Sequence, residues 1–125
     1  MINYSSPYHQ SLLLKVIRDY NSGRTMILGP QFIEKNYSGI QLDEGWELPT
    51  EEDLENSIAT EINNDKWKII RKERDRLLSE TDWITNRAYD RGETVPSSWA
   101  TYRQSLRDIT TQSDPSNITW PTKPE

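Results

Sequence analysis

A long run of helix-favouring sequence that begins at Thr50 most constrains how this chain can fold. Thr50 is placed to cap a helix, and the acidic Glu51-Glu52-Asp53 complements the positive end of the helix dipole. Apolar residues then recur at helical spacing until about Thr81-Asp82. This stripe consists of Leu54, Ile58, Ile62, Trp67, Ile70, Leu77 and Leu78, with Arg74 as its polar member. The run covers about 30 residues, or roughly 45 Å if unbroken. Asn63-Asn64-Asp65 interrupts the pattern, so the helix either continues through this segment or breaks there and folds back.

A helix of this length cannot be buried throughout in a chain of 125 residues. Ile, Leu, Val and Phe supply only 25 of them, close to the level below which chains tend toward disorder. Five Trp and six Tyr offset the shortage in part, because each buried aromatic removes a large apolar area from water. We therefore expect a small core with aromatic anchors. The narrow stripe is expected to pack against a second copy of the chain, giving a homo-oligomer, or against another protein.

The sequence pattern predicts two domains: a small α/β module at residues 1–48 and a helical domain at residues 49–125. In the first, His9–Tyr20 is expected to form a short amphipathic helix, while Thr25–Leu28 and the alternation around Ile40 predict short antiparallel strands. In the second, a turn at Asp90–Glu93 separates the long helix from one opened by Pro96 and capped by a following serine. The fold class is therefore α+β, mainly α, with a C-terminal helical hairpin and an extended, proline-containing tail.

Charge and composition exclude several classes of function. Residues 41–65 hold nine acids and no base, whereas residues 66–107 hold ten bases against six acids. Because the bases alternate with acids, as in Arg71–Arg76, no nucleic acid is expected as a partner. No apolar run reaches the roughly 20 residues of a membrane span, so no membrane partner is expected either. Cysteine is absent, which removes thiolate chemistry and fits a reducing cytosol.

No catalytic, cofactor or metal site is predicted. His9 is the only histidine and lies at a helix start, and no Gly-rich phosphate loop is present. The acids of Glu51-Glu52-Asp53 could suggest a cation site or a small glycan hydrolase, but a helix N-terminus explains them better. We therefore expect a protein that is not an enzyme and that needs no cofactor.

Three segments of the second half carry a specific pattern. Arg74–Trp83 reads RDRLLSETDW, Trp99–Ile109 reads WATYRQSLRDI, and Asn117–Pro124 reads NITWPTKP. In this order they resemble the tail assembly chaperone domain of tail-fibre assembly proteins from tailed bacteriophages, whose pattern is R-x-x-L-L-x-x-T-D-W, W-x-x-Y-R-x-x-L-R-D and W-P-x-x-P. The resemblance covers about residues 69–124. Two departures, an entry to the second helix without acids and a linker without proline at Asn86–Glu93, lie in the loop rather than the core.

The resemblance implies a chaperone-like protein that binds a phage tail-fibre or other tail protein and assists its folding, trimerisation or attachment. Such a protein would act in the host cell cytoplasm during assembly. The alternative is a structural virion component retained on the tail fibre or baseplate. Candidate partner-binding residues are the aromatic and arginine side chains of the matched segments, namely Arg74, Trp83, Trp99, Tyr102, Arg103 and Trp120. The same side chains suit the core of the hairpin, where Arg74 and Arg103 could pair with Asp82 or Asp108, so the sequence leaves open which are core and which are contacts.

Overall fold

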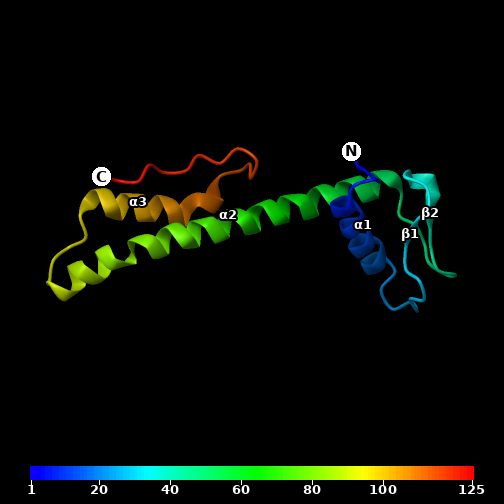
Figure 1. The fold of residues 1–125 in the computed structure, drawn as a ribbon, viewed down its shortest axis with the longest axis horizontal. Coiled ribbons are helices and arrows are strands. Elements are labelled where there is room, and N and C mark those ends of the chain that lie inside the picture. Colours follow the sequence, from blue (N-terminus) through cyan, green and yellow to red (C-terminus); the bar gives the residue numbers. More distant parts are fainter. The chain divides into compact units, whose positions relative to one another are not determined.

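Helices dominate the structure, a computed structural model that describes all of residues 1–125. In chain order the elements are α1 (Pro7–Tyr20), β1 (Gln31–Phe32), a 3-10 turn (Tyr37–Gly39), β2 (Ile40–Gln41), α2 (Glu51–Asp90), α3 (Ser97–Arg107) and a second 3-10 turn (Asp108–Thr111) (Figure 1). The predicted class, mainly α with a small antiparallel sheet, is confirmed. The chain divides into two compact units, Met1–Ile62 (unit 1) and Asn63–Glu125 (unit 2). The domain boundary after residue 48 stays a prediction.

Helix α1 begins two residues earlier than predicted because two local signals coincide. The hydroxyl of Ser6 accepts a hydrogen bond from the His9 amide, and Pro7 occupies the first turn, where its missing N–H costs nothing. At the other end the buried Asn21 closes the helix. Its side-chain Nδ2 donates to the Ile17 carbonyl at 2.8 Å and to the Glu47 carbonyl at 2.9 Å, so it also ties the helix end to the segment before α2.

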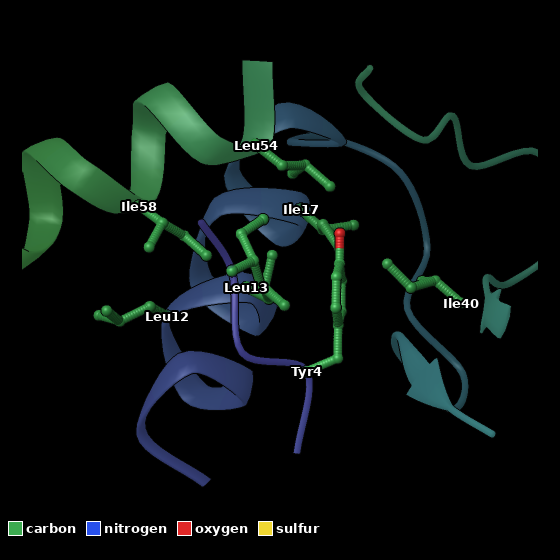
Figure 2. Packing of buried hydrophobic residues seen from close by; sticks show 8 residues of the cluster. Tyr4, Leu12, Leu13, Ile17, Ile40, Leu54 and Ile58 are labelled. Carbon is green, nitrogen blue, oxygen red and sulfur yellow. The ribbon is translucent and has the colours of Figure 1, made fainter. Parts of the chain in front are cut away.

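The core of unit 1 joins α1 to the first turns of α2. Figure 2 shows Leu54 and Ile58 of α2 directed toward Leu13 and Ile17 of α1, with Tyr4 between these α1 side chains and Ile40 of β2. Burying a side chain of this size stabilises a fold by about 1.5–3 kcal/mol, so four such residues supply much of a small unit's stability. Burial, together with the nearby Glu51 carboxylate that accepts a hydrogen bond from the Tyr4 hydroxyl, raises the pKa of Tyr4 to about 12.

The small sheet pairs β1 with β2 in antiparallel register, Phe32 opposite Ile40. The strand predicted at Thr25–Leu28 is absent, and this prediction was wrong. The reason is that the amides a strand would offer to a neighbour are taken by the Asp43 carboxylate, which accepts hydrogen bonds from residues 27, 28 and 29. The segment is therefore a loop with exposed apolar side chains.

Helix α2 starts as the sequence predicted, since the Thr50 hydroxyl accepts the Asp53 amide at 3.1 Å. It is helical through Asn63-Asn64-Asp65, which settles the question of a break there. It also runs past the predicted end at Thr81-Asp82 to Asp90. Ile84 and Ala88 continue its buried stripe. Termination comes only at Gly92, whose φ of +63° is strained for any other residue.

Unit 2 is a helical hairpin closed by an anchored tail. Helix α3 lies beside the second half of α2, and the tail returns along α3 (Figure 1). The predicted serine cap of α3 does not form; Pro96 is the capping residue and makes no side-chain bond. In the tail, the Gln112 side chain exchanges two hydrogen bonds of 2.9 Å with the backbone of Thr119, and Lys66 donates to Ser116 at 2.7 Å.

Candidate protein-binding site

The turn between α2 and α3 forms a hollow of about 220 Å³. The last turns of α2 supply one wall, the connecting segment the floor, and the first turn of α3 the other wall. Its lining residues are Trp83, Ile84, Arg87, Ala88, Glu93, Thr94, Pro96 and Trp99. The hollow exists because α2 continues to Asp90, which places Trp83 and Arg87 one turn apart on the same face.

Trp83 and Trp99 are the two candidate residues that the fold brings together in this hollow. Trp83 is 55% exposed although it is one of the largest apolar side chains. Trp99 is half-buried and makes an edge-to-face contact with Tyr102 at a centroid distance of 5.9 Å, a geometry that holds the indole in place. The hollow therefore has two aromatic walls: Trp99, which is held in place, and Trp83, which is accessible to a partner.

Tyr102 and Arg103 lie on the buried side of α3. Burial raises the pKa of the Tyr102 hydroxyl, and the negative charge of Glu80 adds to the effect. Arg103 donates to the Leu78 carbonyl at 2.9 Å, to the Thr81 hydroxyl at 2.6 Å and to the Asp82 carboxylate at 2.9 Å. Of the two partners that the sequence left open for Arg103, Asp82 and Asp108, the structure has Asp82, and this pairing fixes the register of α3 on α2.

Arg74 and Trp120 do not line the hollow. Arg74 pairs with its neighbour Asp75 at 2.9 Å rather than with Asp82 or Asp108, and its side chain is mostly covered. Trp120 is half-buried in the tail. The role of all six candidates as partner contacts stays a prediction, but only Trp83 combines a large apolar side chain with high exposure.

Sequence reasoning missed the polar lining of the hollow. Arg87 and Glu93 lie in the predicted linker Asn86–Glu93 and Thr94 directly follows it, and only a longer helix places Arg87 beside Trp83. The signal available in the sequence is that Trp83 and Arg87 are four residues apart, which places them on the same face if the helix continues. It requires reading Ile84 and Ala88 as a continued helical stripe.

The remaining features of the molecule concern metal binding, membrane spanning and ion pairs on the surface. No three His, Cys, Asp or Glu side chains are grouped so that they could hold a metal ion. None of the helices has the length and apolar character needed to cross a bilayer. Among exposed ion pairs, Arg76 bridges Glu73 and Glu80 along α2 and lowers the pKa of Glu73 by hydrogen bonding.

Comparison with known proteins matches one part of the chain. Residues 67–125 fit the family model described as phage tail assembly chaperone protein. The match covers all three sequence segments, α3 and every residue that lines the hollow, and it leaves out residues 1–66. No curated protein and no solved structure matches the chain.

Proposed function

We propose that the protein binds a tail-fibre protein and assists its folding, trimerisation or attachment, because residues 67–125 match the model of the phage tail assembly chaperone family. The family supports a general role in tail assembly; the fibre as client and the binding site are the proposal. The observation that carries it is the exposed Trp83 beside the hollow of the family-matched unit. Binding takes place in the host cell during virion assembly and involves no chemical step.

The hollow suits a protruding side chain of a protein partner. Its volume of about 220 Å³ lies below the roughly 300 Å³ at which small-molecule sites begin. Tryptophan and arginine are the residues most enriched where binding energy concentrates, and both line it, as Trp83, Trp99 and Arg87. A partner that covers Trp83 would remove apolar surface from water at about 25 cal/mol per Å².

Co-expression of the phage's tail-fibre gene tests the proposal. The soluble fibre trimer is measured with no chaperone, with the wild-type chain, with Trp83→Ala and with Tyr89→Ala. Tyr89 is the matched control, an exposed aromatic on the same helix that does not line the hollow. We expect the wild type and Tyr89→Ala to raise the trimer yield and Trp83→Ala to raise it much less. Equal yield with and without the chain would refute the function, and equal yield with both variants would refute the site.

A structural role on the fibre or baseplate is the second candidate. It is favoured by Ile69, a large apolar side chain that is 69% exposed on α2 away from the hollow and is available to dock against a neighbouring virion protein. Mass spectrometry of purified particles separates the two roles, since a chaperone that is released would be missing from the virion.

A further inference from the structure

The loop before β1 exposes a group of large apolar side chains that unit 1 does not use. Met26, Ile27 and Leu28 are consecutive and 57%, 77% and 75% exposed, and Ile33 follows at 61%. We call these four residues the apolar loop; the first three precede β1, and Ile33 directly follows it. We propose that the apolar loop is a second contact surface, which inserts into an apolar cleft edged by basic residues on the tail-fibre protein. This inference rests on the proposed function and adds a site outside the family-matched residues.

The loop's backbone is held by a single carboxylate. Asp43 accepts hydrogen bonds from the amides of Ile27 at 2.8 Å, Leu28 at 3.0 Å and Gly29 at 3.0 Å. Three amides converging on one anion fix the direction in which the side chains project. Because only main-chain atoms take part, the identities of residues 27 and 28 are irrelevant to the anchor.

Further bonds hold both ends of the loop. The Trp46 indole donates to the Thr25 carbonyl at 3.0 Å, and Gln31 donates to the Leu28 carbonyl at 3.2 Å. Gly29 adopts a φ of +75°, which lets the chain turn back toward β1. An ordered loop that presents apolar side chains loses little conformational entropy when it binds, which raises affinity. Polar side chains at these positions would make the same backbone bonds without exposing apolar surface.

The surrounding charge indicates what kind of surface the loop fits. Unit 1 carries ten acidic and four basic side chains. Around the loop itself, the acids Glu34, Asp43, Glu44 and Glu47 outnumber the bases Arg24 and Lys35, and Arg24 pairs with Glu47 at 3.7 Å, so a smaller net negative charge remains there. An acidic surround is repelled by an anionic lipid surface and attracted by lysine and arginine. A protein cleft with a basic rim is therefore the complementary partner, whereas scattered single apolar residues would need no partner at all.

Binding of the purified tail-fibre protein to the full-length chain tests the inference. The variant is Ile27→Ser with Leu28→Ser, which keeps the amides that Asp43 binds. The matched control is Tyr20→Ser, an exposed apolar residue of unit 1 outside the loop. Circular dichroism and thermal melts confirm that each variant is folded. We expect the loop variant to bind the fibre about tenfold or more weakly, and the control to bind within about twofold of the wild type.

Other outcomes overturn the inference in distinguishable ways. Fibre binding that is lost in Trp83→Ala but unchanged in the loop variant leaves the proposed function standing and removes the second surface. A wild-type chain that does not bind the fibre removes both. Sedimentation that shows a wild-type dimer and a monomeric loop variant, with fibre affinity unchanged, assigns the loop to a second copy. Loop-dependent binding to vesicles of phosphatidylglycerol would assign it to lipid.

A further variant separates positioning from contact. Asp43→Ala keeps all four apolar side chains but releases the three amides. We expect a smaller loss of fibre affinity than in the loop variant, together with increased mobility of residues 27–29 in NMR relaxation. Increased mobility with wild-type affinity would show that the fixed geometry is irrelevant and would overturn the positioning role of Asp43.

Discussion

Replacing Arg103 by alanine is expected to destabilise unit 2 by about 3 kcal/mol. Two of its acceptors, the Leu78 carbonyl and the Thr81 hydroxyl, lie in the covered interface between α2 and α3. A hydrogen bond from a charged group contributes roughly 1.5 kcal/mol or more. The third partner, Asp82, is 57% exposed, so its pair contributes about 1 kcal/mol or less. The two covered hydrogen bonds, with a small contribution from the exposed ion pair, account for the expected loss of about 3 kcal/mol.

Urea unfolding followed by tryptophan fluorescence measures this effect selectively. Four of the five tryptophans lie in unit 2, so the signal reports mainly on that unit. With an m-value of about 1.5 kcal/mol/M, Arg103→Ala should lower the midpoint by about 2 M. Arg103→Lys keeps the charge but not the forked geometry, and it should fall between the variant and the wild type.

Arg107 provides the control for this experiment. It lies one turn further along α3, is exposed and donates only to Gln104. Arg107→Ala should change the free energy of unfolding by less than about 0.5 kcal/mol. If Arg103→Ala and Arg107→Ala lie within that margin of each other, the argument that Arg103 holds the two helices together is wrong.

Three further predictions concern unit 1. Leu13→Ala removes a fully buried side chain and should cost about 2–5 kcal/mol in urea unfolding followed by circular dichroism, whereas Leu14→Ala, which is 39% exposed, should cost under about 1 kcal/mol. Asn21→Ala removes the bonds between the end of α1 and the segment before α2, and should cost about 2 kcal/mol in the same assay; a neutral result would contradict the structural role of this amide. The backbone amides of residues 27–29 lower the pKa of Asp43 from its ordinary value of 3.8, so the loop's ordering is complete above that value and is lost as pH falls through the lower folded value. NMR titration should show these amides shifting together in that acidic range, and Asp43→Asn should abolish the transition.

Local signals explain the elements that the sequence predicted correctly. Thr50 caps α2, the apolar spacing of α1 predicts its buried face, and Asp82 is one of the two partners that the matched segments left open for Arg103. Each of these depends on residues a few positions apart or on a pattern with strong geometric meaning. The helical hairpin could be predicted for the same reason, because two amphipathic segments joined by a turn have few other ways to bury their stripes.

The errors come from interactions that no local pattern records. Thr25–Leu28 is apolar and bounded by turn residues, as a strand would be, yet Asp43 captures its amides from 14 or more residues away. The end of α2 was placed early because polar residues around Asn86 hid the contribution of Ile84 and Ala88 to the buried stripe. This second error also concealed the hollow, since Arg87 joins Trp83 only on a helix that continues to Asp90.

The Gln112 side chain makes hydrogen bonds to the tail that a neighbouring β-strand would otherwise make. Its amide both donates to and accepts from Thr119, the same two-way exchange that an opposed residue makes in an antiparallel ladder. The tail is thereby held at Thr119. No second extended segment is needed, so there is no unpaired strand edge that could pair with other chains. The segment enclosed between Gln112 and Thr119 can consequently be lengthened at small entropic cost, since closing a somewhat larger ring costs only fractions of a kcal/mol, as long as Ser116 is kept to accept the hydrogen bond from Lys66. This segment is a natural position for inserting a fluorescent or affinity tag that leaves the hairpin undisturbed.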